Sequence, residues 1–548
     1  MTGRPSNHIP PELLLEASVE RLKDKPLKRL FEQDAKRHQR FSFDACGLHL
    51  DYSKNRIDDE TMSALHHWLR SCDFERYQQH FLQGEVVNHT EQRAAAHFAL
   101  RSLSRQSCLV NGKDVMPRVR EQLARMGGLV DSVRSGEWRG YTGRPIRQIV
   151  NIGIGGSGLG PKMATEALSP YHAEQLIAHY VSNVDASEMH QVLRQCEPET
   201  TLFVICSKSF VTKETLTNAL IARRWFFAAG GNTAVLHRHF VAVTSNRPEA
   251  NRFGIHPDQQ YEMWDWVGGR FSLWSSIGLS TALMIGMERF HELLRGAESM
   301  DRHFATAPQE RNMPVVLALL SAWYSRYWQA QSHAVLPYDH YLRFLPEHLQ
   351  QLDMESCGKS VDREGEPVEQ DTGSILWGTA GTDGQHTYFQ LLHQGTRLVP
   401  ADFILIKESH NPYGDNQLWL VASAIAQMEG LMRGKTGKEA AIELSDKGLS
   451  DERVEALLPY CTFEGNRPSN ALVMERLTPT TLGALLALYE HKTFVQSVLW
   501  NINPFDQWGV EYGKQLARTI VDEAECDDAA ERAEHDASTQ SLIDRLLK

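Results

Sequence analysis

A loop at residues 207–215 combines the kinds of side chain that bind a phosphate group. It follows an apolar run and carries, within nine residues, the four hydroxyls of Ser207, Ser209, Thr212 and Thr215 together with Lys208. Hydroxyl donors and free backbone amides at the start of a helix match the acceptor oxygens of a phosphate monoester. A helix cap needs only one such residue. The loop therefore favours monophosphate binding, with simple capping as the alternative.

A glycine-rich loop, Gly153-Ile-Gly-Gly-Ser-Gly158, lies between an apolar run and an expected helix. Its G-x-G-x-x-G spacing is typical of a dinucleotide site, in which Asp185 could contact the ribose. The spacing alone is weak evidence, because any tight strand-to-helix turn selects glycine. If the loop at 207–215 binds phosphate, a second phosphate-binding loop would be redundant. This counts against a dinucleotide at the glycine-rich loop. Ser157 suits a sugar or a phosphate equally well.

Four charged or titratable residues could perform acid–base chemistry on a bound substrate. Arg270 follows two glycines in an aromatic loop, where its planar guanidinium could hold an oxyanion. Glu355 could act as a proton-abstracting base, and His386 could transfer protons near neutral pH. Lys514 could donate to a substrate oxygen. Each of the four, taken alone, also fits an ordinary structural or surface role. No H-E-x-x-H or EF-hand pattern occurs, so we expect no metal site.

Strands alternating with helices are expected to position these loops. Apolar runs predict strands at 149–154, 178–183, 201–206 and 239–244, and this alternation indicates a parallel sheet covered on both faces. Ligand sites in such sheets lie beyond the carboxyl ends of the strands. A second α/β unit is expected from strands at 333–337 and 402–407, with helices at 313–331, 339–354, 415–432 and 478–498. Further expectations are a helix at 9–40, an extended segment at 43–58, helices within 59–135, and a solvated acidic segment at 522–536.

Composition limits the class of protein. The 548 residues predict two domains, and 42% apolar with 23% charged residues is ordinary for a globular chain. A net charge of −12 argues against nucleic acid or an anionic membrane surface as a partner. The eight cysteines contain no C-x-x-C pair, and the N-terminus lacks a secretory signal. Apolar stretches such as 313–323 are too short to cross a bilayer. We expect a cytoplasmic protein.

Two segments carry a resemblance to a known family: Asp265-Trp-Val-Gly-Gly-Arg-Phe-Ser-Leu-Trp274, and the stretch from Ser497 through Phe505-Asp-Gln-Trp-Gly-Val-Glu511 to Lys514. With the glycine loops between them, the chain from Asp51 to Lys514 resembles the glucose-6-phosphate isomerase family of aldose–ketose isomerases. The resemblance implies two sugar-isomerase (SIS) α/β domains, each an α-β-α sandwich around a mostly parallel sheet, with helical extensions at both ends. It implies a smaller domain at 121–289, a larger one at 46–120 plus 290–515, and extensions at 1–45 and 516–548.

The resemblance also implies an activity and a set of site residues. The expected reaction interconverts glucose 6-phosphate and fructose 6-phosphate without a cofactor. Glu355 would move the proton between C2 and C1, and Arg270 would stabilise the enediolate. His386, from the neighbouring subunit of a homodimer, and Lys514 would assist ring opening. The sugar phosphate would be held by Gly156, Ser157, Ser207, Lys208, Ser209, Thr212 and Gln351.

Some positions depart from the usual family pattern. Ser209 and Val211 stand where threonines are usual, Cys357 replaces an asparagine, Thr379-Ala380 replaces Glu-Pro, and Asp383 replaces an asparagine. These changes bear on affinity and leave the proposed chemical groups in place. Three alternatives remain: an NAD-dependent oxidoreductase, a sugar-phosphate sensor without chemistry, and a metal-dependent hydride-shift isomerase.

Overall fold

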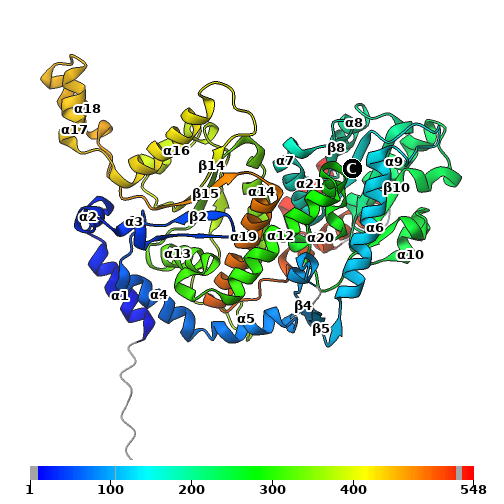
Figure 1. Cartoon of the computed structure of the whole chain (residues 1–548), viewed down its shortest axis with the longest axis horizontal. Coiled ribbons are helices and arrows are strands. Elements are labelled where there is room, and N and C mark those ends of the chain that lie inside the picture. Colours follow the sequence, from blue (N-terminus) through cyan, green and yellow to red (C-terminus); the bar gives the residue numbers. More distant parts are fainter. Residues whose placement is uncertain (1–9, 105–106, 526–532, 548) are drawn as a thin grey trace, which may run out of the picture. The chain divides into compact units, whose positions relative to one another are not determined.

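The computed structural model of the chain describes residues 10–104, 107–525 and 533–547. These residues form two compact units, one ending at Pro504 and the other beginning at Phe505. The first unit contains two sheets that lie side by side (Figure 1). The second unit consists of helices α20 (Trp508–Glu525) and α21 (Ala537–Leu546). Every residue expected in the site, apart from Lys514, belongs to the first unit.

The smaller sheet has five parallel strands in the order β11-β10-β9-β7-β8. They are β7 (Gln148–Ile152), β8 (Ile177–Val181), β9 (Thr201–Cys206), β10 (Phe240–Thr244) and β11 (Gln260–Glu262). The four predicted strands are therefore confirmed. Strands β9 and β10 are buried along their whole length, as expected where helices cover both faces.

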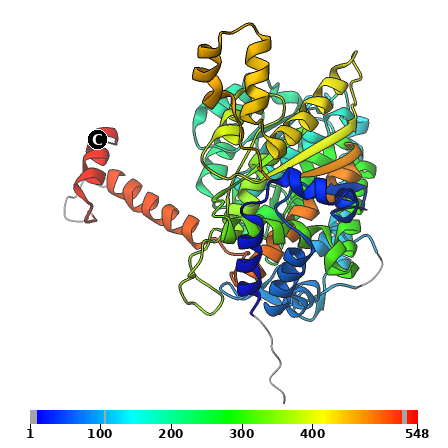
Figure 2. The ribbon, with the colours of Figure 1, turned by 90° about the vertical axis from the view of Figure 1, so that its left-hand side faces the viewer.

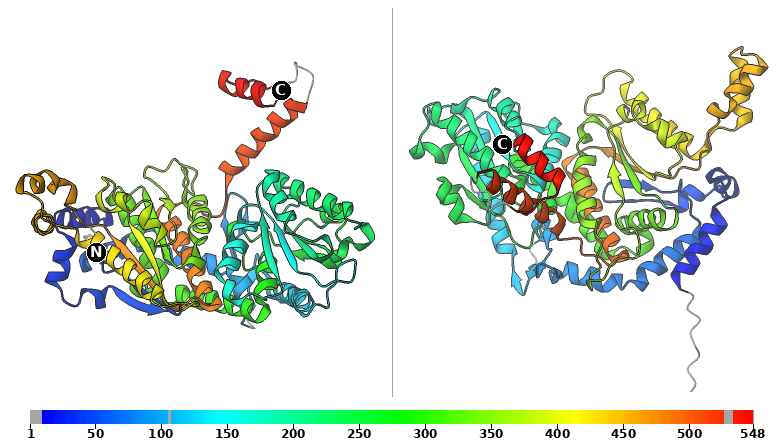
Figure 3. Two further views of the ribbon diagram at one scale, coloured as in Figure 1. Left: turned by 90° about the horizontal axis from the view of Figure 1, so that it is seen from above. Right: turned by 180° about the vertical axis from the view of Figure 1, so that it is seen from behind.

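Helices enclose this smaller sheet from two sides (Figure 3). Apolar side chains of α8 (Ala186–Leu193), α9 (Lys213–Ala228) and α10 (Arg247–Phe253) share one core with the strands. Helices α6 (Met116–Ser135) and α11 (Leu279–Ile285) also contact the strands, and α7 (Leu159–Ala167) packs on α11. The expected α-β-α arrangement is confirmed.

The larger sheet has six strands in the order β1-β2-β15-β14-β12-β13. Strands β12 (Ser332–Tyr338), β13 (Ile375–Trp377), β14 (Ala401–Glu408) and β15 (Ser469–Arg476) are parallel, whereas β1 (Ser42–Ala45) and β2 (Leu48–Asp51) form an antiparallel hairpin at the edge. Its helices include α12 (Met287–Thr306), α13 (Met313–Tyr327), α14 (Leu345–Cys357), α15 (Phe389–Gln394), α16 (Asn416–Arg433) and α19 (Pro479–Leu499).

Several elements differ from the sequence-based expectation. The single helix expected at 9–40 is three helices, α1 (Pro11–Leu22), α2 (Leu27–Gln33) and α3 (Arg37–Arg40), because Pro26 cannot continue α1. The helices expected within 59–135 are α4 (Asp59–Ser71), α5 (Phe74–Leu82) and α6. Between α5 and α6 lie a 3₁₀ turn, His97–Arg101, and two short hairpins, β3 (Val86–Asn88) with β4 (Arg93–Ala94) and β5 (Leu109–Val110) with β6 (Lys113–Asp114).

Strand β15 and the helical hairpin of α17 (Gly437–Asp446) and α18 (Asp451–Cys461) were not predicted. The hairpin extends away from the larger sheet (Figure 2). Of the expected acidic segment at 522–536, residues 522–525 end α20 and residues 533–536 precede α21, while 526–532 lie outside the described ranges. The division into domains stays a prediction, and its boundary at 515/516 falls inside α20.

Two general features of the described chain bear on its chemistry. Seven cysteines, all except Cys526, lie in the described ranges, and each is a free thiol. Within those same ranges, no helix combines the length and apolarity needed to span a membrane.

Candidate active site

The two predicted loops follow neighbouring strands of the smaller sheet. The glycine-rich loop follows β7 and the hydroxyl-rich loop follows β9, which pairs directly with β7. Because β8 lies on the opposite side of β7, the chain diverges here, and such switch points form the ligand crevice of α/β sheets. A Cβ placed on Gly153 would lie 3.1 Å from the Cβ of Cys206, so the loops begin side by side.

The hydroxyl-rich loop is organised by its own hydrogen bonds. The Ser207 hydroxyl donates to the Thr212 hydroxyl (3.2 Å) and accepts from the Phe210 amide (3.1 Å). The Ser209 hydroxyl accepts from the Val211 amide at 3.4 Å. Thr212 occupies the N-cap of α9 without making a side-chain capping bond in the described chain. The first turn of α9 therefore presents amides and hydroxyls together, as a phosphate requires.

Thr215 is a further residue that the sequence analysis left outside the site set. It lies in the first turn of α9, and its buried hydroxyl has no hydrogen-bond partner among the described residues. An unpaired buried polar group is costly, and a bound ligand would pair it. The signal was present in the sequence as the fourth hydroxyl of the loop.

Lys208 connects the hydroxyl-rich loop to the loop that carries Arg270. Its ammonium donates to the main-chain oxygens of Asp265 (3.1 Å) and Val267 (3.4 Å) and lies 3.7 Å from the Asp265 carboxylate. Burial lowers the pKa of Lys208, and the Asp265 carboxylate partly offsets this effect. In this structure Lys208 therefore joins the two loops.

Arg270 and Glu355 form an ion pair in which the guanidinium is buried and the carboxylate is partly exposed. Arg270 Nη1 lies 3.2 Å from Glu355 Oε1, and the exposed fractions of the two side chains are 1% and 19%. Arg270 Nε donates to the Ser356 hydroxyl at 2.7 Å, and Nη2 donates to the main-chain oxygen of Pro504. These contacts hold the guanidinium between the end of α14 and the main chain at Pro504. The alternative of a surface arginine is excluded.

The glycine-rich loop packs directly on the turn that carries Arg270. A Cβ on Gly156 would lie 2.0 Å from the main-chain oxygen of Gly269, so any side chain there would displace the peptide before Arg270. Ser157 is half-buried in this loop, and its carbonyl oxygen accepts from the Asn151 side chain at 3.1 Å. The close approach gives a packing reason for glycine at 156 that needs no dinucleotide.

Gln351 stands one helical turn before Glu355 on α14. A Cβ placed on Gly155 would lie 3.1 Å from Gln351 Nε2, so the glutamine borders the glycine-rich loop. Gln351 Oε1 is buried and has no hydrogen-bond partner among the described residues. Residues four apart share one face of a helix, so Gln351 and Glu355 present an unpaired acceptor and a carboxylate on the same side.

His386 and Lys514 lie on other elements. His386 ends a 3₁₀ turn, Asp383–His386, after β13, and its side chain is exposed. Lys514 lies on α20 in the second unit, where its ammonium pairs with Glu511 at 2.8 Å. Among the described residues, His386 forms no ion pair with Glu355 and no hydrogen bond with Arg270 or Glu355. The roles of His386 and Lys514 therefore stay predictions.

Comparison with known proteins identifies the family. The family model described as phosphoglucose isomerase matches residues 51–543. The chain belongs to this family. It is 52% identical over 522 residues to a glucose-6-phosphate isomerase of Pseudomonas fluorescens strain Pf0-1, covering 95% of this chain and 94% of that protein. It is 51% identical over 517 residues to one of Shewanella loihica, covering 94% of each chain. A crystal structure of a glucose-6-phosphate isomerase from Chlamydia trachomatis superposes with a TM-score of 0.85 at 30% identity, covering 98% of this chain and 99% of that one.

Two of the positions that depart from the usual family pattern, Cys357 and Val211, can be located in the structure. Cys357 is fully buried at the end of α14, two residues after Glu355, and its Sγ lies 3.9 Å from the Thr493 main-chain oxygen. Burial raises the pKa of this thiol well above its usual range. Val211 is half-exposed. Neither departure removes a group from the Arg270–Glu355 pair.

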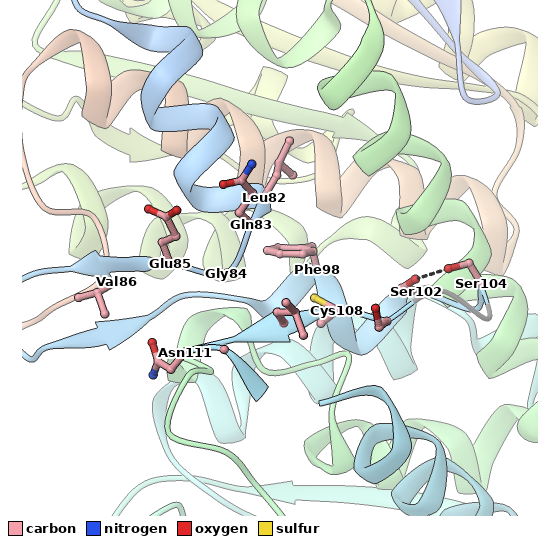
Figure 4. Close-up of a pocket in the computed structure, with 14 residues that line it drawn as sticks. Leu82, Gln83, Gly84, Glu85, Val86, Phe98, Ser102, Ser104, Cys108 and Asn111 are labelled. Atoms are coloured by element: carbon pink, nitrogen blue, oxygen red, sulfur yellow. Dashed lines mark hydrogen bonds between the residues drawn. The ribbon is translucent and has the colours of Figure 1, made fainter. Parts of the chain in front are cut away.

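One cavity in the described chain lies away from these residues. It measures about 700 Å³ and is lined by the end of α5, the 3₁₀ turn His97–Arg101 and the β5–β6 hairpin, with Phe98 and Cys108 among its walls (Figure 4). It contains none of the expected site residues. Among the described residues, no group of three or more His, Cys, Asp or Glu side chains is placed to hold a metal.

Proposed function

We propose that this chain interconverts D-glucose 6-phosphate and D-fructose 6-phosphate by proton transfer through a cis-enediolate, as part of glycolysis and gluconeogenesis. The 3.2 Å pair of Arg270 and Glu355 is the observation that carries the proposal. It joins a carboxylate base to a fixed cation beside a loop suited to phosphate. Such a pair supplies the proton acceptor and the oxyanion stabiliser that this reaction requires.

The charges balance through each proton transfer. Glu355 removes the proton from C2 of open-chain glucose 6-phosphate, the electron pair forms the C1–C2 double bond, and the carbonyl oxygen at C1 becomes negative. The protonated Glu355 no longer neutralises Arg270, so the guanidinium is then available to stabilise the new oxyanion. The hydroxyl proton on the C2 oxygen moves to the C1 oxygen, which transfers the negative charge to the C2 oxygen. Glu355 then returns its proton to C1, the C1–C2 double bond becomes single, and the C2 oxygen becomes the carbonyl. Arg270 thus faces one negative charge before and after the proton moves from C2 to Glu355. The groups around the guanidinium therefore need little rearrangement during the reaction.

The phosphate fixes the sugar at a distance from the reacting carbons. Ser207, Ser209 and Thr212 would bind the phosphate with Lys208 beside them, and Gly156, Ser157 and Gln351 would line the sugar. Binding energy from this remote group is used to orient C1 and C2 against Glu355. His386 and Lys514 would assist ring opening by proton transfer at the ring oxygen. The proposed residues require no metal or cofactor.

A homodimer is proposed, in which His386 completes the site of the neighbouring subunit. Several large apolar side chains on and before α16 support association, since Tyr413, Leu418 and Trp419 are 74%, 70% and 67% exposed. Exposed apolar patches of this kind mark interaction surfaces. Mixing inactive Glu355→Gln and His386→Ala proteins, followed by dissociation and reassociation, should restore activity through mixed dimers. Absence of restored activity, with mixed dimers demonstrated by mass, would refute the shared site. We also propose a cytoplasmic location.

A coupled assay tests the function. Fructose 6-phosphate is supplied, and product glucose 6-phosphate is oxidised by an added NADP-dependent dehydrogenase. We expect turnover that persists in EDTA. Without the coupling enzyme, we expect no reduction of added NAD. Loss of turnover in EDTA would favour a metal-dependent hydride shift, NAD reduction would favour an oxidoreductase, and binding without turnover would favour a sensor.

A further inference from the structure

A cluster of ionisable side chains contacts the segment 268–274 that carries Arg270, which we call the Arg270 turn. No part of the proposed chemistry uses this cluster. We call it the Glu490 cluster, and its members are His97, Arg101, Asp301, Glu490 and His491. Arg101 is fully buried and forms two bonds to Asp301 at 2.8 and 2.6 Å and another to Glu490. His491 Nε2 lies 2.7 Å from Asp301 Oδ1. Three separate elements, the 3₁₀ turn His97–Arg101, α12 and α19, therefore meet here.

The Glu490 cluster holds the Arg270 turn at two points. Trp274 Nε1 donates to Glu490 Oε1 at 2.8 Å, which fixes the C-terminal end of the segment 268–274. The ring of Phe271, the residue after Arg270, stacks on His97 with centroids 4.5 Å apart. His97 Nε2 in turn lies 3.7 Å from Glu490 Oε2. The Glu490 carboxylate thus bonds to Trp274 directly and lies beside His97, on which Phe271 stacks.

Burial shifts the two histidines of the cluster toward their neutral forms. Burial is the main cause that lowers the pKa of His491 and that lowers the pKa of His97 well below its usual range. Arg101 is a permanent cation of the cluster, and it is shared between Asp301 and Glu490. An ion cluster of this kind contributes little net stability over apolar packing, but it fixes geometry because each partner has few allowed positions.

We propose that Glu490, acting through Trp274 and through His97 and Phe271, is a positioning residue that sets where the Arg270 guanidinium points. The proposal rests on the proposed role of Arg270 as the oxyanion stabiliser. Hydrogen bonds to a developing charge require placement of the donor within a few tenths of an ångström. A less rigid Arg270 turn would therefore stabilise the transition state less. Phosphate binding uses a different loop and should be unaffected. The expected signature is a lower kcat with an unchanged KM.

Trp274→Phe is the main test, because it removes the indole donor and keeps an aromatic ring. We expect kcat to fall at least ~10-fold and KM for fructose 6-phosphate to stay within ~2-fold, equivalent to about 1.4 kcal/mol of transition-state stabilisation. Trp323→Phe is the matched control. Trp323 is also fully buried in the first unit and donates Nε1 to a main-chain oxygen, that of Arg56, at 3.2 Å. It should lower the melting temperature similarly while leaving kcat within ~2-fold.

Two comparisons separate the possible failures. If Trp274→Phe and Trp323→Phe change kcat equally, the positioning role is refuted and the cluster only stabilises the fold. If Arg270→Ala leaves kcat unchanged, the proposed function of Arg270 fails instead. Should Trp274→Phe not fold, Phe271→Leu tests the second anchor, since it removes the stack on His97. A folded Phe271→Leu protein with unchanged kcat would equally refute the proposal.

Discussion

Replacing Glu355 with glutamine removes the proposed base and keeps its shape. At 3.2 Å and an effective dielectric constant of about 20, the Arg270–Glu355 attraction is about 5 kcal/mol before desolvation is counted. Most of that does not appear as lost stability, because the glutamine oxygen can still accept from Arg270 Nη1 and the carboxylate is partly solvated. We expect the free energy of unfolding to fall by about 1–3 kcal/mol.

The effect of Glu355→Gln on turnover should be much larger. An amide cannot accept the C2 proton, and losing a positioned base costs roughly 10²–10⁴-fold in rate. We expect kcat to fall at least ~10³-fold, about 4 kcal/mol, while fructose 6-phosphate binds nearly normally. The coupled assay gives kcat, and direct titration gives affinity. Exchange of the C2 hydrogen with deuterated water, followed by NMR, should fall in parallel.

Glu347→Gln is the matched control, because Glu347 lies exposed in the first turn of the same helix, α14. It should leave kcat within ~2-fold, as expected for a surface change. Glu355 is not the base if Glu355→Gln retains more than ~10% of wild-type kcat, since loss of a general base lowers the rate by more than that.

Three further changes test other parts of the structure. Ser207→Ala with Thr212→Ala removes two hydroxyls from the phosphate loop and should raise KM by roughly 10–100-fold, more than it lowers kcat; an unchanged KM would move the phosphate elsewhere. Gly156→Ala should lower kcat at least ~10-fold, because its Cβ would lie 2.0 Å from the Gly269 oxygen, whereas Gly128→Ala, with nothing within 4 Å, should leave kcat unchanged. For Asp58, burial by itself raises the pKa, but hydrogen bonds from Arg21 and Thr61 outweigh it and lower the pKa to about 2. A depressed folded-state pKa adds stability above the unfolded value near 4, and this is lost as pH falls toward 2. Asp58→Asn should therefore lower Tm at pH 7 and flatten its decline between pH 5 and 2.5; an unchanged slope, measured by thermal scanning, would contradict the assignment.

Local sequence patterns predicted the elements whose apolar residues run uninterrupted. Strand β9 is buried at all six positions, and its predicted range, 201–206, agrees with the structure. Strand β15 was missed because its run begins with Ser469 and Asn470 and ends with Glu475 and Arg476. Its place between β14 and β2 depends on pairing partners far away in the chain. Asn470, for example, donates to Asp402 in the neighbouring strand at 2.7 Å.

The sequence by itself determined which chemical groups were available: the hydroxyls after β9, the guanidinium after two glycines, and a carboxylate at a helix end. Only the tertiary structure decided how they meet. It paired Arg270 with Glu355 across 85 positions of sequence, turned Lys208 toward main-chain oxygens of another loop, and left Gln351 Oε1 unpaired. The physical reason is that side-chain type and strand periodicity are local properties, whereas the direction of a charged group is set by partners that folding brings from distant segments.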